Sequence, residues 1–194
     1  MLTKTINLLL LKFTHTMNKL FITLALLTIS VKGFSQQTFT IDEETKQAVY
    51  REVVEVPGAT KAELYDRTLA WMNIFYPNPN GVIQTKNPET GEIVGKAQFK
   101  ITGKDKKGTE TYDGLVGYTI TILFKDGKFK YDITRIHWKL ASYYDVSRWM
   151  DTKDQYYKQS YVSYIEQTNA YFEKLKAELV AAVKSPKPKK SSDW

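Results

Sequence analysis

Few side chains in this sequence could carry out chemistry. His137 is the one histidine after residue 35, and the 194 residues include no cysteine. Without cysteine there is no disulfide, thiol nucleophile or thiolate metal ligand, and a zinc site usually needs several such ligands. A single imidazole beside Trp138 is more often structural than catalytic. We therefore predict no catalytic residue, no metal site and no cofactor, and a hydrolase that uses His137 with a nearby carboxylate is our third hypothesis.

Other catalytic patterns are missing as well. No nucleophile turn of the form Gly-x-Ser-x-Gly, phosphate-binding loop or dinucleotide-binding glycine motif occurs in the sequence. Glu52 and Glu55 are three residues apart in a predicted strand, where successive side chains point to opposite faces. They cannot form a glycosidase pair by themselves. These features favour a protein that binds its ligand without transforming it.

Aromatic residues offer a different kind of site, because the chain contains 13 Tyr, 9 Phe and 4 Trp. Tyrosine and tryptophan join an apolar ring to a polar group, which suits sugars and amphiphiles. The candidate ligand-binding residues are Tyr157 and Tyr161 on a predicted helix and Trp138 on a predicted strand. The alternative, which we favour, is that this aromatic stripe is simply the core-facing side of its helix, because it has ordinary core spacing.

The predicted elements begin with a strand and a helix. Residues 49–56 are rich in β-branched side chains and precede a Pro-Gly turn, which predicts a strand. Thr60 and Glu63 have the spacing of a capping box. Apolar residues at helical spacing follow as far as Tyr76, where nearby prolines end the helix.

Four further strands follow this helix. Alternating or β-branched stretches predict them at residues 82–86, 93–102, 118–124 and 129–140. A charged loop with several glycines is expected at 103–114, and Asp126-Gly127 predicts a tight hairpin turn. The apolar phase changes by one residue after Ile133, which predicts a β-bulge near Arg135.

The last predicted element is a helix over residues 151–184, about 45–50 Å long, that overhangs the sheet or breaks near Asn169. The order β-α-β-β-β-β-α predicts a single α+β domain over residues 36–184, with helices on one face of an antiparallel five-stranded sheet. Residues 185–194 are expected to form a disordered basic tail.

The N-terminal segment predicts export. A basic start at Met17, an apolar run over residues 20–31 and small residues up to Ser35 form a signal peptide cut between Ser35 and Gln36. The run is too short to span a bilayer comfortably, although a buried core helix is another interpretation. Residues 1–16 are either an upstream start that is not used, which we favour, or an unusually long basic region.

Removal of the signal peptide changes the charge of the protein. Residues 1–35 contain four lysines and no acid, so the formal net charge falls from +7 to +3, with 24 basic and 21 acidic residues remaining. We expect a periplasmic or secreted protein with no transmembrane anchor in its mature chain. Its partner would be an unknown ligand or protein of the envelope, and nucleic acid is not expected.

Several segments resemble a known family. Residues 53–67 with Trp71, residues 93–97 and the hairpin of residues 118–131 are similar to exported bacterial proteins of unknown function, common in Bacteroidetes and described as having a TATA-box-binding-protein-like (TBP-like) fold. The resemblance covers about residues 45–140. It implies that fold and no catalytic residues, and the name of a fold gives no reason to expect DNA binding.

Three functions are therefore carried forward. The first is a non-enzymatic exported binding or interaction module. The second is a carrier of a lipid or other apolar ligand, in which the sheet curls around the last helix as in helix-grip folds. The third is the weak hydrolase.

Overall fold

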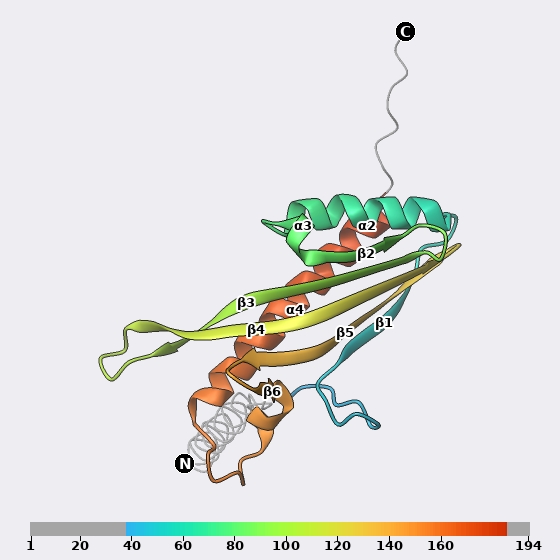
Figure 1. Cartoon of the computed structure of the whole chain (residues 1–194). Coiled ribbons are helices and arrows are strands. Elements are labelled where there is room, and N and C mark those ends of the chain that lie inside the picture. The colour runs from blue at the N-terminus through green and yellow to red at the C-terminus, as the bar shows by residue number, and fades with distance from the viewer. Residues whose placement is uncertain (1–37, 186–194) are drawn as a thin grey trace, which may run out of the picture. The chain divides into compact units, whose positions relative to one another are not determined.

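The computed structural model describes residues 38–185 (Figure 1). The predicted cleavage site between Ser35 and Gln36 and the tail from residue 186 lie outside the described residues. The elements in chain order are β1 (Tyr50–Glu55), α2 (Lys61–Phe75), α3 (Pro79–Val82), β2 (Ile83–Asn87), β3 (Glu92–Lys104), β4 (Glu110–Lys125), β5 (Lys128–Lys139), β6 (Tyr143–Asp145), the 3-10 helix η1 (Val146–Met150) and α4 (Ser160–Lys184).

The strands of this segment form one six-stranded antiparallel sheet. Its order is β1-β5-β4-β3-β2, and the short strand β6 pairs with the end of β5. Helix α4 packs on β3, while α2 packs on β4, β5 and α4 (Figure 1). The predicted α+β class and antiparallel sheet are confirmed. The sixth strand was not predicted, because three residues are too few to show a period.

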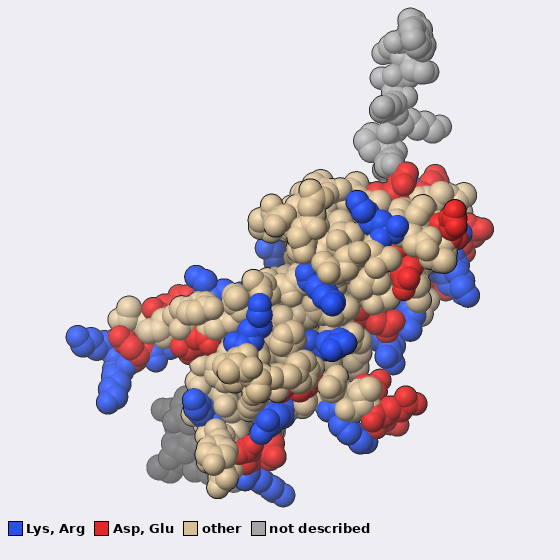
Figure 2. All heavy atoms as spheres, in the orientation of Figure 1, with Lys and Arg blue, Asp and Glu red and all other residues tan. Residues whose placement is uncertain are grey.

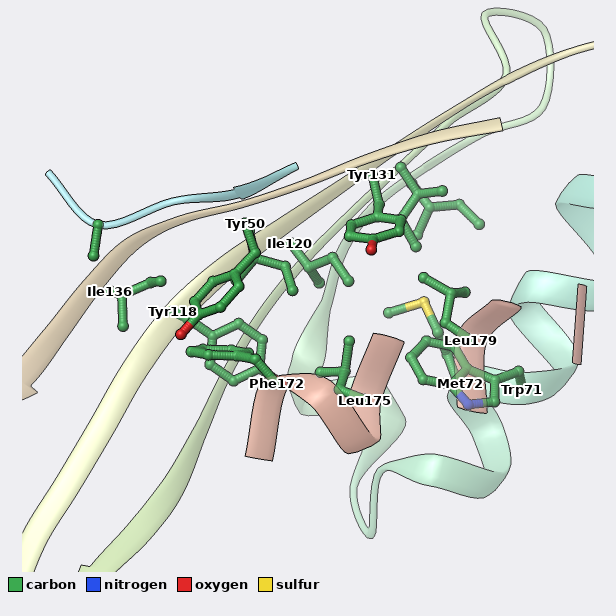
Figure 3. Close-up of a cluster of buried hydrophobic side chains, with 14 of the residues drawn as sticks. Tyr50, Trp71, Met72, Tyr118, Ile120, Tyr131, Ile136, Phe172, Leu175 and Leu179 are labelled. Carbon is green, nitrogen blue, oxygen red and sulfur yellow. The ribbon is translucent and has the colours of Figure 1, made fainter. Parts of the chain in front are cut away.

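The core lies between the helices and one face of the sheet. Its aromatic and aliphatic side chains interdigitate in the close-up of Figure 3, where α4 faces the strands. The labelled members are Tyr50, Trp71, Met72, Tyr118, Ile120, Tyr131, Ile136, Phe172, Leu175 and Leu179. The opposite face of the sheet carries mainly Lys and Thr side chains, as expected where one face meets water.

Helix α2 begins and ends where the sequence predicts. The Thr60 hydroxyl accepts a hydrogen bond from the Glu63 N–H (3.2 Å), and the Glu63 carboxylate accepts one from the Thr60 N–H (2.8 Å). The short helix α3 was missed, because its prolines indicated only a stop. Proline is tolerated in the first turn of a helix, and the Asn78 side chain caps this turn by accepting from the Gly81 N–H (3.2 Å).

The last helix is shorter than predicted. It begins at Ser160, so residues 151–159 are not helical. The carboxylates of Asp151 and Asp154 accept hydrogen bonds from backbone N–H groups two residues later (3.0 and 2.8 Å), which stabilises turns that compete with a helix. From Ser160 to Lys184 the helix is unbroken at Asn169, whose side chain accepts a hydrogen bond from a tyrosine hydroxyl of β1.

The loop expected at residues 103–114 is mostly strand. Strand β3 continues to Lys104 and β4 starts at Glu110, so the two form a long hairpin with a short turn (Figure 1). Both faces of the outer part of this hairpin meet water, so its sequence has no alternation of apolar and polar residues. The backbone hydrogen bonds between β3 and β4 continue there although the sequence lacks that pattern.

The predicted bulge is present in β5. Thr134 pairs with Thr119 and His137 with Gly117, so Tyr118 of β4 lies opposite two residues of β5. One of these is Arg135, whose φ of 52° is in the left-handed region. Among residues 38–185, no helix is both long and apolar enough to cross a membrane.

Candidate functional site

An open groove of about 690 Å³ lies beside the middle of β3 and β4. The connection from α2 to α3 forms one wall, and the end of β5 with Tyr143 of β6 forms the other. Its size is in the usual range for small-ligand sites. Gly117 of β4 lies in the floor of the groove, next to the imidazole of His137.

His137 occupies the space that Gly117 leaves. A Cβ atom on this glycine would lie 2.6 Å from Cε1 of His137, so a larger residue would displace the imidazole. The ring stacks on Tyr143 with centroids 5.2 Å apart. Its Nδ1 is 2.8 Å from the carbonyl oxygen of Arg135 and donates to it in the neutral ring. This arrangement leaves Nε2 as the atom available to a ligand.

The bulge decides where His137 points. Side chains alternate along a strand, and a shift of one residue moves all later side chains to the opposite face. Phe129, Tyr131 and Ile133 face the core, and Ile136 faces it again after the bulge. Without the extra residue His137 would face the core. Residues other than glycine rarely adopt positive φ, and such conformations often occur at functional sites.

The charge of the groove is positive. Lys96, Arg135 and Lys139 line it, no aspartate or glutamate does, and none of the three makes an ion pair with a described residue. The Lys139 ammonium instead donates to the side-chain oxygen of Gln98 (2.9 Å). Figure 2 shows Lys and Arg side chains over the region of β3, β4 and β5. Cations without a carboxylate partner favour an anionic ligand.

A chain of tyrosine hydroxyls lies on the core face of the sheet, opposite the face that carries Lys96 and His137. Tyr76 and Tyr118 are lining residues and their hydroxyl oxygens are 3.0 Å apart, while Tyr118 and Tyr171 are 2.9 Å apart. Burial raises the pKa of all three tyrosines, so they stay neutral. Three hydroxyls supply three protons and two hydrogen bonds join them. One of the three hydroxyls therefore keeps a proton that no bond within this chain uses.

The three aromatic residues predicted to bind a ligand also lie together. The rings of Trp138 and Tyr161 are 6.2 Å apart, and those of Tyr157 and Tyr161 are 5.7 Å apart. Tyr161 is buried, and the Trp138 indole donates to the carbonyl of Asp113 (3.1 Å). Trp138 and Tyr161 pack against the buried Trp149, and none of the three lines the groove. A ligand-binding role for them stays a prediction.

Several groove residues were missed in the sequence. Lys96, Lys139 and Gly117 have no motif that distinguishes them from other residues of a solvated sheet face. The bulge near Arg135 was predicted, and its effect on His137 could have been derived from the same phase change. That is the one sequence feature that could have led to the groove.

A second hollow, of about 730 Å³, has the opposite character. It lies between residues 40–44 and β1, and its lining includes Asp42, Glu43, Glu44 and Glu52 together with Arg51 and Lys176. No group of three or more His, Cys, Asp or Glu side chains in residues 38–185 could hold a metal ion.

The comparisons with known proteins match part of this chain to a family and show its fold. Residues 50–139 match the family described as a domain of unknown function (DUF4468) with TBP-like fold. The resemblance predicted from the sequence is confirmed.

Solved structures show the same fold. A DUF4468 family protein from Bacteroides ovatus matches with a TM-score of 0.62 and 17% identity, covering 80% of this chain and 98% of its own. A TBP-like protein from Parabacteroides distasonis matches with a TM-score of 0.59 and 15% identity, covering 73% of this chain and 95% of its own. No curated protein matches the chain. At these identities the likeness concerns the fold alone.

Proposed function

We propose that this chain is a non-enzymatic exported binding module that holds an anionic ligand in the groove beside Gly117. The observation that carries the proposal is the set of three cationic side chains that line the groove without a carboxylate. The ligand would carry carboxylate, sulfate or phosphate groups, and acidic glycans of the cell envelope are the class that we favour.

The groove also suits the remainder of such a ligand. Tyr143 is half exposed beside His137 and offers an aromatic ring to a sugar. Gln98 and Thr119, which line the groove on the same face of the sheet as Lys96, add polar groups. An acidic sugar would use both kinds of contact.

The carrier alternative has less support. Phe172, Leu175 and Leu179 of α4 are fully buried and face the side chains of the sheet in Figure 3. Rings from α4 and β4 touch directly, as Phe172 and Tyr118 do with centroids 5.1 Å apart. A helix-grip carrier would keep this region free for its ligand.

The hydrolase alternative has one supporting observation, since His137 does line the groove. A general base usually needs a group that orients it. For His137 the orienting group is the backbone carbonyl of Arg135. The carboxylate of Asp145, which pairs with His137 across the strands, instead accepts hydrogen bonds from Tyr143 and Ser147. Binding is therefore the better use of this imidazole.

The proposal can be tested by calorimetry on the mature chain. The probes are trigalacturonate and a heparin tetrasaccharide, with neutral maltotriose for comparison. We expect binding of at least one acidic probe, weaker at high salt, and none of maltotriose. Removal of two charges in the double variant Lys96→Gln/Lys139→Gln should weaken that binding by about tenfold or more, because each charged hydrogen bond contributes about 1.5–3 kcal/mol.

The matched control is Lys104→Gln/Lys174→Gln, which removes two lysines that do not line the groove. It should bind as the parent does. Equal loss in both double variants would show a general charge effect and contradict the groove. Preference for duplex DNA over both acidic probes would contradict an envelope ligand.

A further inference from the structure

Strand β1 is an uncovered edge of the sheet. It pairs with β5 on one side and has no neighbour on the other among residues 38–185. The hairpin before β1 follows this edge only as far as Val49, whose N–H donates to the carbonyl of Thr40 (2.9 Å). Helix α4 contacts β1 from the core face, where Phe172 and Asn169 meet the Tyr50 side chain, and no strand of the described residues pairs along the outer edge of residues 51–55.

The backbone groups that face this edge can be assigned. The Val56 N–H donates to the Gly127 carbonyl (2.7 Å), so this pair is hydrogen bonded. Hydrogen-bonded and non-bonded pairs alternate in an antiparallel ladder. The even residues of β1 therefore bond to β5, and Arg51, Val53 and Glu55 direct their N–H and C=O groups to the free side.

The side chains of the same three residues share the open face of the sheet. Val53 is 54% exposed, which is unusual for a valine in a strand, and Leu123 of β4 is 40% exposed nearby on that face. Arg51 and Glu55 are half or more exposed, although Arg51 contacts Asp132 (2.5 Å) and Asp42 (3.6 Å) and Glu55 contacts Lys128 (3.9 Å).

This pattern is complementary to itself. If a second β1 lies antiparallel with Val53 opposite Val53, each Arg51 comes opposite a Glu55 of the other copy. Opposite charges in directly facing positions stabilise strand pairs, and like charges destabilise them. A two-fold axis satisfies both ion pairs at once, as closed dimers require. The other edge lacks this property, because β2 is irregular between Ile83 and Thr85 and adjoins α3.

We propose that two copies of this chain associate through their β1 strands, with Val53 at the two-fold axis, to form one continuous antiparallel sheet. Both helical layers then lie on the same side of the joined sheet, and both grooves remain open because they lie on β3–β5 and not on β1. This dimer is independent of the ligand proposed above.

The absence of cysteine allows a direct test. Val53→Cys introduces a single thiol, and across a hydrogen-bonded pair the two Cα atoms would be about 5.5 Å apart. The short linker bismaleimidoethane should therefore give a covalent dimer in high yield. Tyr112→Cys, exposed on the β3–β4 hairpin, is the control and should remain mainly monomeric under the same conditions.

Charge reversal tests the register by light scattering on the protein without cysteine. Glu55→Arg places two arginines opposite each other at both ends and should weaken the dimer by about tenfold or more. The double variant Arg51→Glu/Glu55→Arg restores opposite charges and should restore the dimer. Charged edge residues can also serve to prevent strand pairing. A monomeric parent at all concentrations, or cross-linking of Tyr112→Cys equal to that of Val53→Cys, would overturn the proposal.

Discussion

Single buried residues affect how the stability of this fold depends on pH, and the clearest examples are Tyr76, Tyr118 and Tyr171. Burial raises the pKa of each above its ordinary value near 10, so the folded chain keeps these hydroxyls protonated at pH values where the unfolded chain loses its protons. The folded state then binds more protons than the unfolded state, and the free energy of unfolding must fall as pH rises above 10.

We predict that urea denaturation will show this loss between pH 9 and pH 11. Each tyrosine that remains protonated in the fold should lower the free energy of unfolding by about 1.4 kcal/mol at pH 11. Tyr118→Phe removes one of these three groups, so the decrease should be smaller, although the variant is less stable at pH 9. A stability that does not change up to pH 11 would contradict the neutral hydroxyl chain.

His137 shows what could be predicted at the residue scale. Its isolation among possible catalytic groups was evident from the sequence, and so was the phase change that turns it outward. Its position over Gly117 was not, because that depends on the register between β4 and β5. The cations of the groove were hidden for the same reason: Lys96 and Lys139 come from different strands, and only sheet pairing brings them together.

At the scale of elements, the capping box of α2 gives a prediction. Thr60→Ala removes the hydroxyl that accepts from the Glu63 N–H. It should lower the free energy of unfolding by about 1 kcal/mol without changing the fold, as loss of an N-cap usually does. Thr109→Ala, in the exposed turn between β3 and β4, is the control and should have little effect in the same urea titration. Equal effects of the two substitutions would contradict a role for the cap.

Elements with a strong local signal were predicted well. The cap at Thr60 and the alternation along β4 follow from neighbouring residues, so the sequence alone indicates them. The start of α4 was predicted too early because of the aspartates in residues 151–159. Their side chains can accept hydrogen bonds from backbone N–H groups either at the start of a helix or in a turn, and here they form turns. The outer part of the β3–β4 hairpin is held by backbone pairing, which a charged sequence does not reveal.

At the scale of the whole molecule, the fold and the function are separate questions. The order of elements predicts an antiparallel α+β sheet, and the TBP-like fold that the family resemblance implies is shared with structures of 15–17% identity. A binding function at the groove rests on three cations and a bulge that the fold itself does not require. The positive charge of the 194 residues is also a poor guide, because four of the lysines precede the predicted cleavage site.

Export is the prediction that concerns the whole chain. Expressed in a Gram-negative host, the 194-residue protein should reach the envelope fraction with the mass of residues 36–194, because the apolar run after Met17 has the length of a signal peptide and not of a membrane span. Leu26→Arg interrupts that run and should leave the uncut protein in the cytoplasm. If synthesis starts at Met17, Met1→Ala should not affect export. Met17→Ala should then abolish the protein that starts at residue 17. Export would be contradicted if the unsubstituted protein stayed uncut in the cytoplasm. If the groove of that protein nevertheless bound acidic probes, its ligand would be a cytoplasmic one.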